Sequence, residues 1–180
     1  MTTTSIDQPE LVTLRLRLRR LAPSDAGLIQ LYASDARVAR MTTSIPHPYP
    51  PGGTEAFIAR ATSPSSRETV WALDTGTEAE RNGLIGLISA NATSDDAAEI
   101  GYWVAPAFWN AGYAGEAVDA VVREMTRRGF AAVTAQAFQD NVASVRVLSR
   151  AGFAYEGEGE LYSVARGGMV PTFRYRRDLR

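Results

Sequence analysis

The stretch from Trp103 to Val118 has the residue types and spacing of a phosphate-binding site. Pro106 ends a preceding strand of aromatic and β-branched residues, because proline has no N–H group to donate to a sheet. Gly112 and Ala114 then leave the backbone bare at the start of an amphipathic helix, where several N–H groups have no partner within the helix. Such groups bind phosphate with the help of the helix dipole. A diphosphate bound here would place the rest of its ligand along the strand that ends at Val104.

The residue types that the chain lacks narrow its chemistry further. It has no cysteine, which excludes thiol catalysis, thiolate zinc sites and disulfides. All 19 basic residues are arginine, so a Walker-type phosphate loop and a Schiff-base lysine are also excluded. The single histidine, His47, cannot build a His-paired metal site, and no metal is expected. The remaining chemistry is that of backbone amides, carboxylates, hydroxyls and an organic ligand.

Length and charge predict an ordinary globular domain. The 180 residues favour one domain over residues 11–180, after a flexible tail at residues 1–10 that lacks the apolar segment of a secretory signal. A net charge of −1 does not favour a nucleic-acid partner. No apolar run reaches the roughly 18 residues of a membrane helix, so we expect a cytoplasmic protein with no membrane partner.

Hydrophobic periodicity predicts mixed α/β (α+β) architecture in the order β-α-α-β-β-β-α-β-α-β-β. The expected strands are Val12–Arg20, Thr69–Asp74, Leu84–Ala90, Ala98–Val104, Ala131–Phe138, Phe153–Tyr162 and Thr172–Arg177. The expected helices are Ala26–Ala33, a short extension at Asp35–Met41, Glu55–Ala61, Gly115–Arg128 and Asn141–Gly152. Thr54 is expected to cap the helix that follows it. Thr69–Asp74 and Leu84–Ala90, separated by a polar turn, predict an antiparallel hairpin.

Four local signatures follow one another in this order. They are Leu14–Arg19, Glu99–Val104, Trp109–Ala114, and Asn141–Ser144 with Ala151–Phe153. Together they resemble the GCN5-related N-acetyltransferase (GNAT) superfamily, and most closely its branch of ribosomal-protein N-terminal alanine/serine acetyltransferases. The resemblance covers nearly the whole chain, from Leu11 to Arg177.

The resemblance implies a single-domain fold with a mostly antiparallel sheet splayed around an acetyl-CoA site. It implies acetyl-CoA as cosubstrate and a primary amine, such as a protein N-terminus, as acceptor, with direct attack in a ternary complex. The N–H group of Val104 could then polarise the thioester carbonyl. The residues expected to contact acetyl-CoA are Tyr102, Trp103, Val104, Trp109, Asn110, Ala111, Gly112, Tyr113, Ala114, Gly115, Asn141 and Ser144.

Two residues are the candidates for proton transfer in such a reaction. Glu99, on the strand that carries the cosubstrate, is the candidate base, or else a solvent-facing glutamate at a strand start. Ser144 is the candidate acid for the departing thiolate, or else a first-turn residue that serves the helix backbone. Leu148 stands where many relatives carry a tyrosine acid, so the acid must come from elsewhere or from water. Asn141 is expected to cap the helix and to bond the pantetheine amide.

The acceptor is expected near the proline-rich loop and Glu99. His47 and Tyr49 lie in that loop, where the acceptor site of the family opens. His47 could take a proton near neutral pH, or could simply be an exposed loop residue.

Other functions remain open at this point. The acceptor could be a small amine such as an antibiotic, a polyamine or an amino acid. The chain could also be a non-catalytic module that binds acyl-CoA, as a monomer or a homodimer. A dinucleotide-dependent oxidoreductase is disfavoured, because Gly112 to Gly115 lacks the Gly-x-Gly-x-x-Gly spacing.

Overall fold

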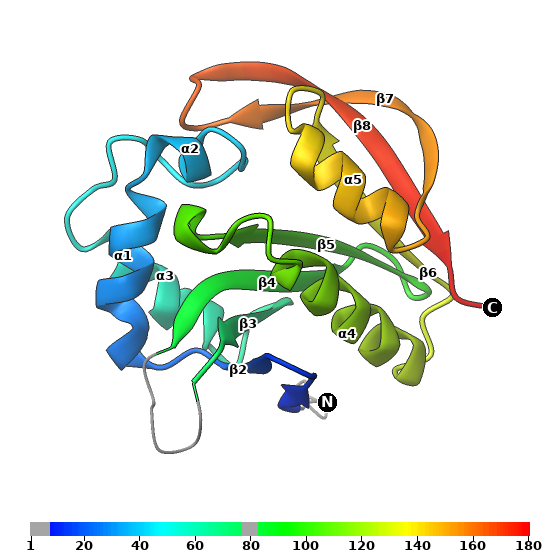
Figure 1. Ribbon diagram of the computed structural model, residues 1–180, viewed down its shortest axis with the longest axis horizontal. Helices are drawn as coiled ribbons and strands as arrows, with labels where there is room; N and C mark the ends of the chain where they lie inside the picture. The colour runs from blue at the N-terminus through cyan, green and yellow to red at the C-terminus, as the bar shows by residue number, and fades with distance from the viewer. Residues whose placement is uncertain (1–7, 77–82) are drawn as a thin grey trace.

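The computed structural model describes residues 8–76 and 83–180, which form one eight-stranded sheet with helices on both faces (Figure 1). The strands are β1 (Leu11–Val12), β2 (Arg17–Arg20), β3 (Glu68–Asp74), β4 (Leu84–Ala92), β5 (Ala97–Val104), β6 (Ala132–Phe138), β7 (Ala154–Ser163) and β8 (Gly168–Asp178). The α-helices are α1 (Ala26–Ala33), α2 (Ala36–Ala39), α3 (Gly53–Ala61), α4 (Tyr113–Arg127) and α5 (Val142–Arg150).

The sheet has the strand order β1-β2-β3-β4-β5-β6-β8-β7 and is antiparallel at every pair except β5 and β6. This confirms the predicted mixed, mostly antiparallel fold. The parallel pair joins residues 97–100 of β5 to residues 132–135 of β6 and then stops. Residues 101–104 of β5 and 136–138 of β6 continue without pairing to each other. We call the space between them the strand opening.

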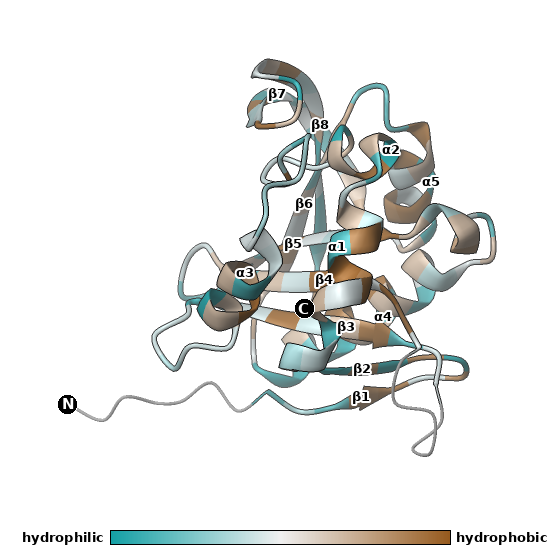
Figure 2. Cartoon of the chain, turned by 90° about the vertical axis from the view of Figure 1, so that its left-hand side faces the viewer, coloured by the Kyte–Doolittle hydropathy of each residue, from teal (hydrophilic) through white to brown (hydrophobic). Residues whose placement is uncertain are grey.

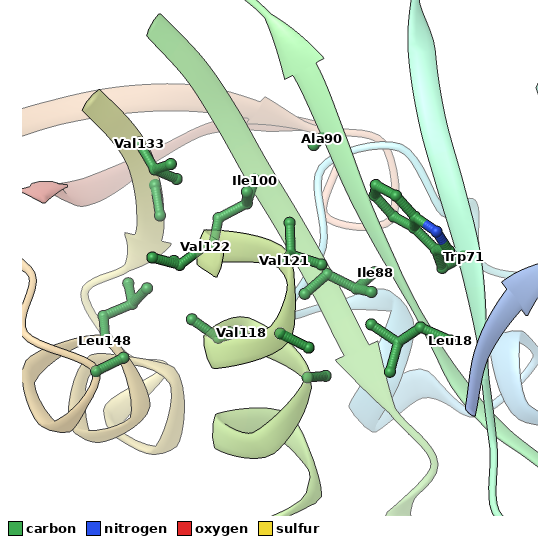
Figure 3. Packing of buried hydrophobic residues seen from close by; sticks show 14 of the residues in the cluster. Leu18, Trp71, Ile88, Ala90, Ile100, Val118, Val121, Val122, Val133 and Leu148 are labelled. Carbon is green, nitrogen blue, oxygen red and sulfur yellow. The ribbon is translucent and has the colours of Figure 1, made fainter. Parts of the chain in front are cut away.

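Alternating side chains of the strands fill two separate hydrophobic clusters. Trp71 and Leu73 of β3 point into the larger cluster, which packs against α4 and α5 (Figure 3). Val70 and Ala72 of the same strand point into the smaller cluster, which packs against α1 and α3. The period of two along a strand therefore directs successive residues to opposite faces. Figure 2 shows α3 and α4 on opposite sides of the sheet.

Helix α4 is held on the sheet by one apolar stripe. Val118, Val121, Val122 and Met125 are spaced by three or four residues and are buried, which is the spacing of one helix face. Gly129 follows the helix with φ +88°, a left-handed conformation that suits glycine after a helix end. The packing of this helix fixes its first turn against the end of β5.

One predicted strand is wrong in its middle. The stretch from Val12 to Arg20 forms two short strands joined by a turn at residues 13–16 rather than one continuous strand. The Thr13 hydroxyl accepts a hydrogen bond from the Leu16 amide (2.9 Å), and the Thr13 amide donates to the Leu16 carbonyl (2.9 Å). Leu14 is 93% exposed and Leu16 only 2%, so the leucine–arginine alternation crosses a turn.

The predicted cap at Thr54 is also wrong. Helix α3 begins one residue earlier, at Gly53, and its N-cap is Gly52, which has φ +73°. Thr54 lies within the first helical turn with its side chain buried. The two consecutive glycines allow a left-handed residue to start the helix, where a Thr cap would need an extended backbone.

The other predicted elements are present, and their ends differ by no more than two residues except at β8, which begins at Gly168 rather than Thr172. The polar turn between β3 and β4 lies largely in residues 77–82, outside the described part of the chain. The tail at residues 1–10 stays a prediction, and only residues 8–10 of it are described. Pro9 accepts a hydrogen bond from the Trp71 indole (3.0 Å). Among the described residues, no helix has the length and apolar character needed to span a bilayer.

Arg19 ties the start of α1 to the sheet. Its guanidinium donates to both carboxylate oxygens of Asp25 (2.8 and 2.9 Å) and, through Nε, to Asp74 of β3 (2.6 Å). The side chains of Asp25 and Asp74 are 2% and 5% exposed. Hydrogen bonding to Asp25 raises the pKa of Arg19 above its ordinary range, so the cation persists at every working pH.

Replacing Arg19 by methionine should therefore destabilise the fold strongly, because it leaves two buried carboxylates without their cation. We expect the free energy of unfolding to fall by about 3 kcal/mol, measured by urea denaturation. Arg176→Met is the matched control, since Arg176 pairs with exposed Asp178 (2.8 Å) and should change the stability little. Equal losses in the two variants would contradict a structural role for the Arg19 network.

Candidate active site

The end of β5 presents backbone groups to the strand opening. The Ala105 amide donates to the Ile85 carbonyl of β4 (2.7 Å), which fixes the alternation of hydrogen bonds along the antiparallel pair. The backbone groups of Tyr102 and Val104 therefore face away from β4 and toward the opening. These are two of the residues that the sequence analysis expected to bind a pantetheine chain.

Trp109 closes part of this edge. Its indole N–H donates to the Val104 carbonyl (2.6 Å), and the Arg37 guanidinium lies 5.7 Å from the centre of its ring. The Val104 amide and both backbone groups of Tyr102 remain directed at the opening. Trp109 was predicted to contact acetyl-CoA, and that contact stays a prediction; its bond to Val104 was not anticipated.

The loop of residues 109–112, which we call the phosphate loop, has a backbone suited to anions. Asn110 and Gly112 have φ +59° and φ +84°, and α4 starts at Tyr113. Left-handed residues that alternate with ordinary ones turn successive N–H groups toward one point. The first-turn N–H groups of Tyr113, Ala114 and Gly115 have no partner within the helix, because helical bonds begin four residues in. The predicted phosphate-binding residues therefore lie together at one helix N-terminus.

Arg15 reaches this loop from the turn between β1 and β2, a contact that the sequence analysis missed. Its Nη1 donates to the Ala111 carbonyl (2.7 Å), its Nε donates to Glu116 (2.8 Å), and its guanidinium lies 4.5 Å from the centre of the Tyr113 ring. Burial raises the pKa of Glu116, but hydrogen bonds from Thr13 and Arg15 outweigh it and lower the pKa overall. Arg15 thus neutralises a carboxylate in the first turn of α4, where an anion is expected.

A cavity of about 810 Å³ continues from the strand opening. Residues from β5, α5 and the proline-rich loop line it, including Glu99, Tyr102, Asn141, Ser144 and Tyr49. The structure therefore brings both candidate proton-transfer residues into one space. His47 is exposed and does not line this cavity, so its role stays a prediction without support from position.

Glu99 is half-buried on the face of β5 that also carries Trp103. Burial raises the pKa of its carboxyl group above the ordinary value. A carboxylate with a raised pKa is a stronger base than an exposed one, as a proton acceptor requires. Among the described residues, no three carboxylate or imidazole side chains gather as metal ligands.

Ser144 and Tyr102 form a hydroxyl pair across the strand opening. Asn141 caps α5 by accepting a hydrogen bond from the Ser144 amide (3.1 Å), as predicted for the cap. The Ser144 hydroxyl lies 2.8 Å from the Tyr102 hydroxyl. Burial raises the pKa of Tyr102 to about 12, against the opposing effect of its bond to Ser144. Leu148 points into the larger hydrophobic cluster instead of the cavity (Figure 3).

Comparisons with known proteins agree with this arrangement. A family model described as an acetyltransferase (GNAT) domain matches residues 15–154. A Bacillus subtilis protein named uncharacterized N-acetyltransferase YoaA is 32% identical over 173 residues, covering 93% of this chain and 95% of that protein.

Two solved structures are similar in fold. A GNAT-family acetyltransferase from Bacillus anthracis superimposes with a TM-score of 0.80 at 20% identity, covering 95% of this chain and 99% of that one. The ribosomal-protein-S5-alanine acetyltransferase from Vibrio fischeri superimposes with a TM-score of 0.77 at 19% identity, covering 94% and 96% of the two chains. At such identities the likeness extends to the fold alone.

The first turn of α4 provides a test of phosphate binding that leaves the fold intact. A side chain at Gly115 would meet no atom within 4 Å, and its φ is not left-handed. Gly115→Leu should therefore keep or raise the melting temperature, because glycine is a poor helix former. It should lose the rise in melting temperature that acetyl-CoA gives by binding the folded state.

Gly27→Leu is the matched control for that variant. Gly27 is also a helical glycine with open space around it, but it lies in α1, far from the phosphate loop in the sequence. Its variant should keep the full response to acetyl-CoA. The phosphate-binding assignment is wrong if acetyl-CoA shifts the melting temperature of Gly115→Leu as much as that of the parent.

Proposed function

Because the chain belongs to the acetyltransferase (GNAT) family, we propose that it transfers the acetyl group of acetyl-CoA to a primary amine by direct attack in a ternary complex. One observation carries the proposal. The phosphate loop, the free edge of β5 and the cavity with Glu99 and Ser144 follow one another along a single path. That sequence of sites matches a ligand with a diphosphate, an amide-bearing arm and a reactive end.

The backbone binds and polarises the cosubstrate in this proposal. Amides of residues 110–115 bind the diphosphate, and Tyr102 and Val104 pair with the pantetheine arm as an added strand. Acetyl-CoA supplies an activated thioester. The Val104 amide, which faces the strand opening, donates a hydrogen bond to its carbonyl oxygen and stabilises the negative charge that develops there. Asn141 and Trp103 line the same cavity beside this arm.

Two side chains move the protons. Glu99 accepts a proton from the attacking ammonium group, directly or through water, because only the neutral amine is a nucleophile. Ser144 donates a proton to the sulfur as the carbon–sulfur bond breaks. The two residues line one cavity but come from different elements, β5 and α5, so the base and the acid approach the reaction from different sides.

The acceptor is a singly charged amine in this proposal, with a protein N-terminus as the first candidate. Among the residues that line the cavity, the charged ones are Arg60, Glu68 and Glu99, which sum to one negative charge. Tyr49 and Phe57 add aromatic wall beside them. The structural likeness to the ribosomal-protein-S5-alanine acetyltransferase supports an N-terminal amine. A polyamine would bring several positive charges into a cavity that offers one net negative charge.

Release of CoA from acetyl-CoA tests the activity and the acceptor together. The panel should contain peptides that begin with alanine or serine, free amino acids, aminoglycosides and spermidine, with mass spectrometry of each product. We expect acetylation of the peptides or of another monoamine in preference to spermidine. Saturable binding of acetyl-CoA with no CoA release from any acceptor would instead support a non-catalytic acyl-CoA module.

Replacing Glu99 by glutamine tests the base. The amide keeps the shape but accepts no proton, so kcat should fall about a hundredfold near neutral pH while binding of acetyl-CoA stays near the parental value. The deficit should shrink as the pH rises, since more of the amine is then already neutral. The parent should lose activity on the acid side at a pH above the ordinary glutamate value, because burial raises the pKa of Glu99.

Glu68→Gln is the control for this series. Glu68 lines the same cavity but is exposed on β3, so its variant should keep the pH–rate profile of the parent. A profile for Glu99→Gln that overlays the parent at every pH would remove Glu99 from the mechanism and leave water as the leading proton acceptor.

A further inference from the structure

We infer that the Tyr102 side chain positions the proton of Ser144 and replaces it during thiolate departure, an inference that rests on the proposed acetyl transfer. The sequence analysis gave Tyr102 a role only through its backbone. The structure places its hydroxyl group 2.8 Å from the Ser144 hydroxyl. Tyr102 is therefore a positioning residue that acts through Ser144.

The position of the pair is the first argument. Tyr102 comes from the part of β5 that has lost its partner strand, and Ser144 from the first turn of α5. Their contact spans the strand opening, where the thioester must lie if the backbone of β5 binds the pantetheine arm. Tyr102 is two residues before Val104, a rise of about 7 Å along a strand. The proposed carbonyl donor and the hydroxyl pair thus flank one short length of the opening.

Hydrogen-bond counting is the second argument. Each hydroxyl group has one hydrogen to donate, so only one partner can donate in the contact between them. The Ser144 hydroxyl can point its hydrogen at the sulfur only when it accepts from Tyr102. The raised pKa of Tyr102, about 12, keeps the phenol protonated and able to donate at working pH. The Ser144 carbonyl, at 3.5 Å, is a poorer acceptor for this phenol than the hydroxyl oxygen.

The proton transfers balance without a further reactant. The carbon–sulfur bond breaks and its electron pair stays on sulfur. The Ser144 hydroxyl gives its proton to that sulfur and takes the phenolic proton of Tyr102 in return. Tyr102 regains a proton from solvent once CoA has left. Phenol is a stronger acid than a serine hydroxyl, so the relay avoids a free serine alkoxide.

The contact has alternatives that the surroundings weaken. The Asn141 cap already bonds the Ser144 amide, so the serine hydroxyl is not needed to satisfy the helix start. Tyr102 packs against the larger hydrophobic cluster through its ring, which phenylalanine would preserve. Removal of the phenol oxygen alone therefore separates the proposed relay from packing.

Kinetics of Tyr102→Phe, Ser144→Ala and the double variant provide the first part of the test. We expect each single variant to lower kcat about ten- to a hundredfold with the KM for acetyl-CoA nearly unchanged. The double variant should be no slower than Ser144→Ala, because two residues that act as one unit are not additive. Independent losses that multiply in the double variant would overturn the inference. Tyr155→Phe, an exposed tyrosine outside the cavity, is the control for loss of a phenol oxygen.

Titration of bound CoA provides the second part and needs no acceptor. The thiolate is followed by its ultraviolet absorbance in complexes with the parent, Tyr102→Phe and Tyr155→Phe. A hydrogen bond to the thiolate favours the charged form, so the pKa of the bound thiol should be lower in the parent than in Tyr102→Phe. Equal thiol pKa values in those two complexes would contradict the inference even if acetyl transfer is confirmed. A lower thiol pKa in the parent without turnover would separate failure of the proposed function from failure of this inference.

Discussion

The early end of the pairing between β5 and β6 is the constraint on which the candidate site depends. Four residues of β5 run on after the last pair, at Ile100 and Ala135, and their outward backbone groups have no neighbouring strand on that side. Buried amide and carbonyl groups need hydrogen-bond partners. The Trp109 indole satisfies one of them, the Val104 carbonyl. The remaining groups point into a cavity and are suited to a ligand that carries amides of its own.

The rest of the domain keeps this edge available. Helix α4 is fixed on the sheet by its apolar stripe, which holds its N-terminus just beyond the end of β5. Arg15 ties the phosphate loop to the turn between β1 and β2, and Arg19 ties α1 to β3. Helix α5 then brings Ser144 to the far side of the opening. Each element contributes one fixed position around a gap that no strand fills.

The parts of the site that are continuous in sequence could be predicted, and those that depend on distant contacts could not. The stretch from Trp109 to Gly115 carries its own signal, because glycine and alanine spacing and the start of an amphipathic helix are local features. Arg15 lies nearly a hundred residues from its partners Ala111 and Glu116. The contact between Tyr102 and Ser144 likewise joins a strand to a helix 42 positions away. The alternation around Leu14 predicted a strand where side-chain bonds of Thr13 make a turn.

Amide hydrogen exchange with and without acetyl-CoA, resolved residue by residue by nuclear magnetic resonance, tests the central claim that the free edge of β5 and the start of α4 form one binding surface. Exchange should slow at the amides of Tyr102, Val104 and Gly115 when acetyl-CoA saturates the protein. The Ala105 amide already donates to Ile85 and should change much less. Saturation by acetyl-CoA with unchanged exchange at Val104 and Gly115 would contradict the account.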